Sequence, residues 1–140
     1  MTTTAHAHAQ LNRAVVAFLD GRRLRGFIYD FSAVKDFFRL SPEGDPLNQR
    51  GTEIKVKELK AIFFVKDFAG NAESTEAESE ATSRHGRSME IVFADGEIIK
   101  GNTDAYNPRK LGFFLFPAKG KGNNLRIFVI NQNVTKARFL

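Results

Sequence analysis

The sequence predicts an all-β protein made of two tandem five-stranded small barrels, SH3-like or Sm-like, that are related by an internal repeat. Three features of the 140 residues support this prediction. The two halves are similar at an offset of about 75 residues, Asp-Gly pairs follow alternating apolar residues, and a segment without large apolar residues separates the halves. The 14 Phe, accompanied by 2 Tyr and no Trp, are suited to filling such cores.

The repeat is visible when residues 14–42 are laid over residues 88–117. Residues 53–65 align more loosely with residues 126–140. Self-similarity at a fixed offset indicates a duplication. The identical positions are Phe18, Asp20, Gly21, Gly26, Lys35, Phe38, Leu40 and Pro42 in the first copy, which fall on Phe93, Asp95, Gly96, Gly101, Lys110, Phe113, Leu115 and Pro117 in the second.

Each copy begins with a predicted β-hairpin. Apolar residues alternate up to Phe18 and Phe93, and an Asp-Gly pair follows each run. Asp-Gly favours a tight hairpin turn because both residues tolerate positive φ. The second strands, 24–29 and 98–103, each contain a glycine at the same place, which predicts a bend or bulge that curls the sheet.

Three more strands are predicted in each copy, and a single turn containing Leu59 or Val134 is expected before the last of them. Five short, strongly bent strands suit a small barrel. The predicted ranges are 37–40, 52–56 and 61–65 in the first copy and 112–116, 125–129 and 135–139 in the second.

Composition sets the domain boundaries. Residues 1–11 predict a disordered tail, and residues 69–88, rich in Ala, Ser, Thr and Glu, predict an acidic flexible linker. Between and after these segments lie the two barrel repeats, at 12–68 and 89–140. Because each copy has only about fifty residues, we expect the copies to pack on each other or on another chain.

Composition also excludes several classes of function. Without cysteine there is no disulfide framework, thiol nucleophile or cysteine zinc cluster. The opening residues lack a secretory signal, and no apolar run approaches the length of a membrane span, so we expect a cytoplasmic protein without membrane contact. The net charge of +5 divides into +3 over residues 1–70, −2 over 71–88 and +4 over 89–140, which is typical of a mixed charged surface.

An enzyme is not predicted. His6, His8 and His85 all lie in segments expected to be disordered, so the folded parts lack the commonest general base. Asp20 and Asp95 are explained by their hairpin turns. No catalytic, cofactor-binding or metal-binding residues are predicted, and no cofactor is expected.

Residues 15–31, VVAFLDGRRLRGFIYDF, resemble the first Sm motif of the Sm and LSm family, with apolar alternation, a hairpin, and Gly then an acid in the second strand. The resemblance implies a small barrel and, in that family, RNA binding by ring-shaped assemblies. Asp30 matches the acid of the motif. Val34 and Lys35 stand where the family has an apolar-Asn pair, and the Arg-Gly pair before the last strand is absent.

The pattern DG…G…DF…FxL, followed by LKAIFFVKDF and GFFLFP…NNLRIFVIN…ARFL, is similar to a bacterial family of uncharacterised proteins. That resemblance implies an association with signalling modules such as receiver and PilZ domains, without a known activity. Arg22, Arg23 and Arg25 before Asp30-Phe31-Ser32 also contain pieces of the PilZ motif for cyclic di-GMP, but at a different spacing.

We therefore predict a non-catalytic protein-interaction or adaptor module in bacterial signalling or regulation, with a protein partner or self-association. The alternative is a nucleic-acid or nucleotide binder that uses basic loops. The candidate partner surface consists of Phe27, Tyr29, Phe31, Phe37, Tyr106, Phe114 and Phe116. The candidate anion contacts are Arg109, Lys110, Lys119, Lys121 and Arg126.

Overall fold

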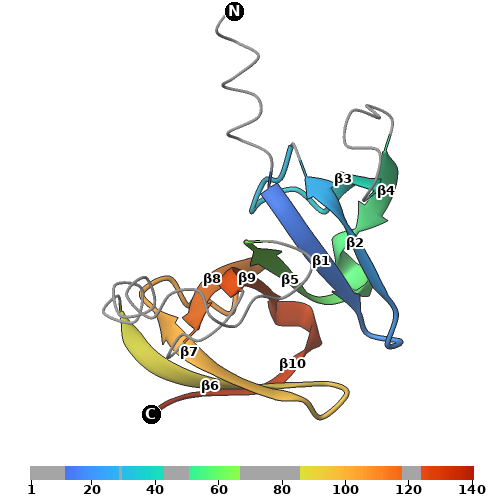
Figure 1. Ribbon diagram of the computed structural model, residues 1–140. Helices are drawn as coiled ribbons and strands as arrows, with labels where there is room; N and C mark the ends of the chain where they lie inside the picture. The colour runs from blue at the N-terminus through green and yellow to red at the C-terminus, as the bar shows by residue number, and fades with distance from the viewer. Residues whose placement is uncertain (1–11, 29, 43–50, 67–85, 118–123) are drawn as a thin grey trace, which may run out of the picture.

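The computed structural model describes residues 12–28, 30–42, 51–66, 86–117 and 124–140 (Figure 1). Within these ranges no helix is long and apolar enough to span a bilayer. The first half contains β1 (Asn12–Phe18), β2 (Arg23–Ile28), β3 (Phe37–Pro42), β4 (Thr52–Lys55), the 3-10 helix η1 (Val56–Glu58) and β5 (Leu59–Val65). The second contains β6 (Arg87–Phe93), β7 (Ile98–Thr103), β8 (Gly112–Pro117), β9 (Asn124–Ile130), the 3-10 helix η2 (Asn131–Asn133) and β10 (Val134–Phe139).

The prediction of an all-β chain is confirmed, and strand pairing unites all the described strands in one open antiparallel sheet. The order across this sheet is β10-β6-β7-β8-β9-β5-β1-β2-β3-β4. Each half therefore follows the same order, with its fifth strand beside its first, and the halves meet where β5 pairs with β9. Figure 1 shows the first half beside the second, joined at β5 and β9.

Several predicted boundaries are corrected by the structure. Leu59 and Val134 are the first residues of β5 and β10, because the tight turn before each strand is complete one residue earlier, in η1 and η2. A bend or a bulge was expected in the second strands; register shifts are found outside them, at Ala17/Phe18 where β1 pairs with β5 and at Val134/Lys136 where β10 pairs with β6. β6 begins at Arg87, inside the segment predicted to be a linker.

The first hairpin of each half has the same turn chemistry. Gly21 and Gly96 adopt φ of 98° and 95°, a conformation that residues with a side chain rarely adopt. The aspartate before each glycine accepts a backbone hydrogen bond two residues on: Asp20 from Arg22 at 2.9 Å, and Asp95 from Glu97 at 3.0 Å. The Asp-Gly signal therefore identifies both turns.

Gly26 and Gly101 lie where the backbone of the next strand comes close to their own. A Cβ at Gly26 would be 2.2 Å from the carbonyl oxygen of Ser41, and one at Gly101 would be 2.4 Å from that of Phe116. We expect Gly26→Ala and Gly101→Ala each to lower the free energy of unfolding by about 1–3 kcal/mol, because backbone must move to admit the methyl group. Urea denaturation measures this. Ala105→Ser, which adds one atom at an exposed position, is the control, and an unchanged midpoint for both glycine variants would contradict the close approach.

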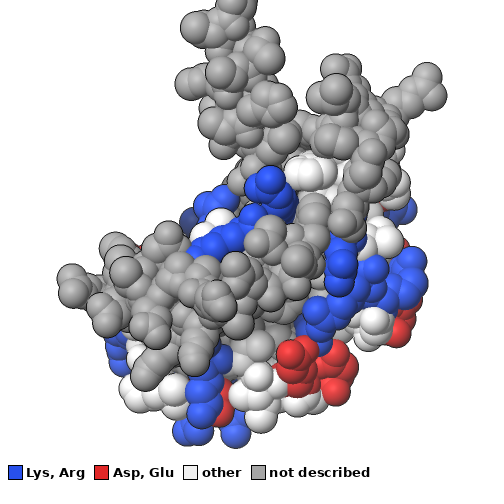
Figure 2. Space-filling model, viewed as in Figure 1, with Lys and Arg blue, Asp and Glu red and all other residues white. Residues whose placement is uncertain are grey.

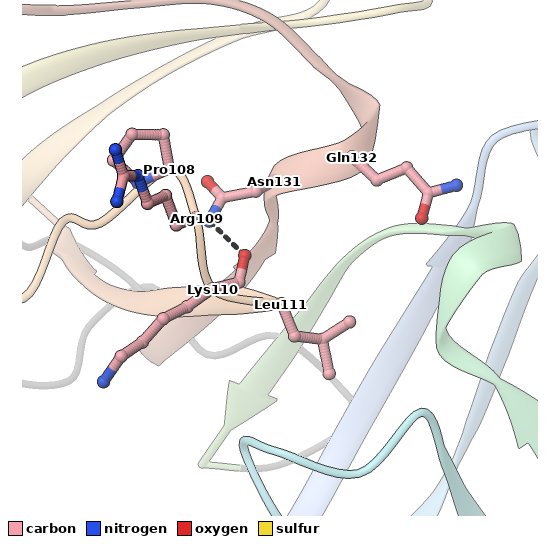
Figure 3. A pocket seen from close by; sticks show the side chains of 6 residues that line it. All are labelled: Pro108, Arg109, Lys110, Leu111, Asn131 and Gln132. Carbon is pink, nitrogen blue, oxygen red and sulfur yellow. Dashed lines mark hydrogen bonds between the residues drawn. The ribbon is translucent and has the colours of Figure 1, made fainter.

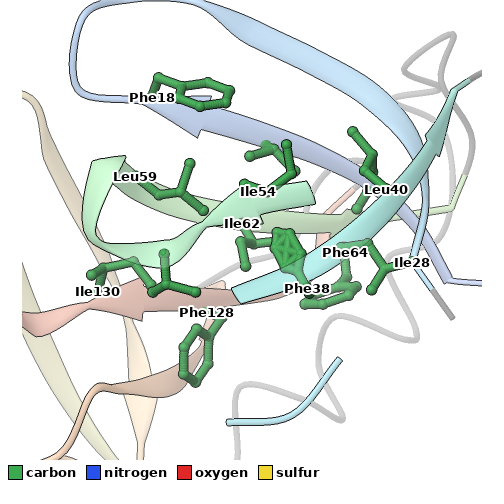
Figure 4. Close-up of a cluster of buried hydrophobic side chains, with 13 residues drawn as sticks. Phe18, Ile28, Phe38, Leu40, Ile54, Leu59, Ile62, Phe64, Phe128 and Ile130 are labelled. Atoms are coloured by element: carbon green, nitrogen blue, oxygen red, sulfur yellow. The ribbon is translucent and has the colours of Figure 1, made fainter. Parts of the chain in front are cut away.

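The apolar side chains form two clusters, and each half contributes to both. Cluster 1 lies inside the first half, but it includes Phe128 and Ile130 of β9, both fully buried (Figure 4). Cluster 2 lies inside the second half, but it includes Ala61, Phe63 and Val65 of β5. This is possible because successive strand residues point to opposite faces, so the two paired strands each serve both cores.

Polar contacts also join the halves. The ammonium of Lys60, whose side chain is 6% exposed, is paired with Asp95 at 3.0 Å and with Glu97. The Asn133 amide donates hydrogen bonds to the carbonyl oxygens of Leu59 and Lys57. Each half thus contributes polar groups that are satisfied by the other, which supports cooperative folding of the whole sheet.

The charges of this contact shift the pKa values of its members. Burial by itself would lower the pKa of Lys60, but hydrogen bonds to Glu97 and Asp95 and attraction to their charges raise it above its ordinary value. The pKa of Asp95 is lowered, chiefly by the hydrogen bond from the Glu97 backbone and then by that from Lys60. The structure therefore favours the charged form of both groups.

Candidate functional site

Two adjacent hollows lie between the β7–β8 connection and the segment that forms η2 and β10. The first, of about 380 Å³, is lined by Pro108, Arg109, Lys110, Leu111, Asn131 and Gln132 (Figure 3). The second, of about 180 Å³, is lined by Tyr106, Pro108, Asn131, Val134, Thr135, Lys136 and Ala137. Because the two hollows share Pro108 and Asn131, we treat them as one feature and call it the β10 groove.

The walls of the β10 groove are fixed by local hydrogen bonds. Asn107 begins a turn in which its side-chain oxygen accepts from the Arg109 N–H and its carbonyl oxygen accepts from the Lys110 N–H. Proline at the next position has a φ suited to such a turn. From the opposite wall, the Asn131 amide donates to the carbonyl oxygens of Asn107 and Lys110, both at 2.9 Å. Figure 3 shows the hydrogen bond to Lys110. The turn is therefore fastened to η2.

The β10 groove is positively charged. Arg109, Lys110 and Lys136 line it and are exposed, and none of its lining residues is acidic. The exposed Asp104 belongs to the same connection but is not part of the lining. Basic side chains recur across the described surface in Figure 2, where acidic ones gather in fewer places. A groove of this kind attracts anionic groups.

The neighbouring surface of β10 shows the same positive field. Glu90 on β6 is hydrogen-bonded by Arg138 at 2.7 Å. Its pKa is lowered, first by this hydrogen bond and also by the charges of Arg138, Lys100 and Lys136. The single carboxylate of Glu90 thus faces three cationic side chains, so this part of the surface carries a net positive charge.

β10 is an edge strand. Among the described strands only β6 pairs with it. The Leu140 N–H donates to the Ser88 carbonyl oxygen of the neighbouring chain segment. Along an antiparallel pair, residues alternately direct their N–H and C=O toward the partner strand and away from it. The N–H and C=O of Ala137, three residues before Leu140, therefore point away from β6. Unpaired groups of this kind are the part of a sheet to which another strand can add.

Aromatic side chains border this edge. Tyr106 makes edge-to-face contacts with Phe113, at 5.1 Å between ring centroids, and with Phe139, at 6.0 Å. Phe139 is 40% exposed, and the guanidinium of Arg87 lies 3.9 Å from its ring centroid. The edge therefore combines backbone groups, apolar rings and positive charge.

The predicted partner-surface residues do not form one surface. Tyr106 lies at the β10 groove. Phe31 and Phe114 pack against cluster 1, and Phe31 contacts four other rings there, so these two serve mainly the core. Phe27, Phe37 and Phe116 are half-buried on β2, β3 and β8, and Tyr29 lies outside the described residues.

The predicted anion contacts also divide. Arg109 and Lys110 come together in the β10 groove. Arg126 lies on β9 instead, with its guanidinium 4.7 Å from the ring centroid of Phe64 and 4.6 Å from that of Phe114, and burial lowers its pKa. Lys119 and Lys121 lie outside the described residues.

Sequence reasoning missed the wall formed by Asn131, Gln132 and Lys136. The alignment of the two copies could have identified this wall, because it places Asn131–Asn133 in the short turn before the last strand. A turn at that place packs against the connection before the third strand, as the hydrogen bonds of Asn131 show.

A family model described as a family of unknown function, DUF6982, matches residues 10–140, a range that includes every described strand. The chain belongs to DUF6982. The match treats both halves of the sheet as one unit, in agreement with the shared cores of this DUF6982 chain. No curated protein and no solved structure matches it.

Proposed function

We propose that this DUF6982 chain is a non-catalytic protein-interaction module, an adaptor that binds an acidic, extended segment of a protein partner along β10 and the β10 groove. The observation that supports this most directly is that an edge strand and a basic groove lie side by side and share Val134, Thr135, Lys136 and Ala137. Strand addition to a sheet edge is a common mode of peptide binding.

The backbone would supply the affinity in this mode. A partner strand beside β10 would pair with the outward N–H and C=O of Ala137 and extend the sheet by one strand. Alternate side chains of that strand would lie on the two faces of the sheet. One of these faces carries Lys136 and Arg138, so acidic residues fit there.

The groove would supply the specificity. Arg109 and Lys110 form its basic part, and Tyr106 gives an apolar wall with a polar end. Arginine is suited to carboxylates because its planar group binds them through two parallel hydrogen bonds. An acidic peptide that leaves the β10 edge would meet these groups next.

The absence of a catalytic role is part of the proposal. The described residues contain neither histidine nor cysteine, the groups most used as general base and nucleophile. Asp20 and Asp95 are engaged in hairpin turns and ion pairs. These features support binding rather than reaction.

We include in the proposal the reading of the halves as duplicated SH3-like or Sm-like barrels. It is supported by their common strand order, matching hairpin turns and matching bulges. The setting in bacterial signalling rests on the resemblance noted in the sequence.

Binding is tested with a short fluorescein-labelled peptide of alternating Glu and Val. We expect anisotropy to rise on titration with the protein, and Arg109→Glu with Lys110→Glu to weaken the affinity about tenfold or more, equivalent to about 1.4 kcal/mol. The matched control is Arg25→Glu with Lys57→Glu, which reverses two exposed charges in the first half and should change the affinity much less.

Two further arms decide the mode and the class of ligand. Ala137→Pro removes an outward N–H and should abolish peptide binding while thermal unfolding stays cooperative, since proline is tolerated on edge strands. Single-stranded oligouridine is the probe for the nucleic-acid alternative. Salt-sensitive binding of oligouridine that exceeds binding of the peptide would overturn the proposal in favour of a nucleic-acid binder.

A further inference from the structure

The two halves are joined by the pairing of β5 with β9. In the internal repeat, the strands equivalent to these two are β10 and β4, which lie at the two ends of the described sheet. In the first half Phe18 pairs with Leu59 beside a bulge, and in the second Phe93 pairs with Val134 beside a bulge. The same offset makes β10 the counterpart of β5, and β4 the counterpart of β9. β5 and β9 pair with each other, whereas β10 and β4 lie at the two ends of the sheet that the described strands form.

The β5–β9 junction is apolar on both faces. On one face Ala61 and Phe63 of β5 lie in cluster 2, at 0% and 9% exposure. On the other face Phe128 and Ile130 of β9 lie in cluster 1, both at 0%. Each strand therefore buries its outward side chains in the core of the other half.

The sheet ends carry charges at the same positions. Lys136 and Arg138 of β10 correspond to Ala61 and Phe63. Glu53 and Lys55 of β4 correspond to Phe128 and Ile130. All four charged residues are exposed. In an end-to-end copy of the junction, each of them would point into the core of the neighbouring molecule.

The polar contacts of the junction are also missing at the ends. Asn133 donates to two carbonyl oxygens of the first half, whereas its counterpart Glu58 would place a carboxylate against such oxygens. Lys60, which pairs with Asp95 and Glu97, has Thr135 as its counterpart. The ends therefore reproduce the backbone of the junction without its side-chain contacts.

We propose that Glu53, Lys55, Lys136 and Arg138 protect the two ends of the sheet against head-to-tail joining of copies of this chain. Moving charged side chains from water into an apolar core is costly, and charged residues on edge strands are a known defence against such pairing. With apolar residues at these four positions, β4 of a second copy becomes the partner of β10. This proposal is independent of the peptide-binding function, because it concerns the size of the assembly and not binding of a peptide.

The test replaces the charged residues at each end of the sheet with the apolar residues found at the equivalent positions of β5 and β9. One variant carries Lys136→Ala and Arg138→Phe, a second carries Glu53→Phe and Lys55→Ile, and a third carries all four substitutions. By light scattering coupled to gel filtration, we expect the unsubstituted chain to be monomeric at micromolar concentration. The fourfold variant should form dimers and larger head-to-tail oligomers as its concentration rises, because a heterologous contact does not close on itself after two copies.

The two half-variants make the test specific. Each alone should remain monomeric, because one charged edge is still present in every head-to-tail contact. An equimolar mixture should form a one-to-one dimer and stop there. Arg25→Phe with Lys100→Phe, on the interior strands β2 and β7, controls for general stickiness and should remain monomeric. Head-to-tail oligomers of the unsubstituted chain, or a fourfold variant that melts cooperatively and stays monomeric, would overturn the proposal.

Discussion

Phe128→Ala is expected to destabilise both halves of the protein at once, by about 3–5 kcal/mol, the usual cost of removing a buried phenylalanine ring. Phe128 belongs to β9 of the second half, yet its ring is fully buried in cluster 1 of the first half. There it contacts Phe31 at 4.9 Å and Phe114 at 5.1 Å between centroids. Removing the ring leaves a cavity at the β5–β9 junction.

Urea denaturation measures the loss of stability, and hydrogen exchange reports where protection is lost. We expect amides of β1 and β5 and amides of β6 and β9 to lose protection together. Phe139→Ala removes the same ring from a partly exposed site and should cost much less. An unchanged melting of β6–β10 in the Phe128 variant would mean that the halves fold independently.

The Lys60 contact should respond asymmetrically to loss of its partners. In Asp95→Asn with Glu97→Gln the ammonium stays nearly buried without a countercharge, which we expect to cost about 2–3 kcal/mol, below the range for a fully buried pair because the acids are partly exposed. Lys60→Met leaves two acids that water can solvate and keeps the side-chain length, so a cost of about 1 kcal/mol or less is expected. Equal losses for the two variants would contradict this account.

The same contact predicts a pH dependence of stability. The pKa of Asp95 in the folded chain is below its ordinary value of 3.8, so its contribution is complete above that pH and is lost as the pH falls through the folded value. The pKa of Lys60 is above its ordinary value of 10.5, so its contribution is present below that pH and is lost as the pH rises through the folded value. Lys60→Met should reduce the dependence at both ends, as measured by thermal melting across the pH range.

Local patterns in the sequence were sufficient to predict where the strands and the first hairpin of each half lie. Asp-Gly with alternating apolar residues located both first turns, and the repeat located the later strands to within a few residues. Turn chemistry acts over a few residues, so one sequence is enough to detect it.

Packing of the two copies on each other or on another chain was expected from their small size, but the pairing of β5 with β9 was not predicted, because it depends on residues far apart in the chain. A signal for it was present. Residues 59–65 are apolar on both faces apart from Lys60, whereas their counterparts 134–139 alternate with Lys136 and Arg138. A strand without alternation is a strand covered on both sides. Of the residues that line the candidate site, Arg109 and Lys110 were named from the sequence, and the opposing wall was not.

The shared cores also have a consequence for the order of events during synthesis. Ala61 pairs with Val129, so nearly half of the chain separates the two strands of the junction. Phe63 and Val65 leave the ribosome long before β9 exists to cover them, and pairing between distant strands is intrinsically slow. The first half must therefore wait, with an apolar surface open to water, until the second half has been made.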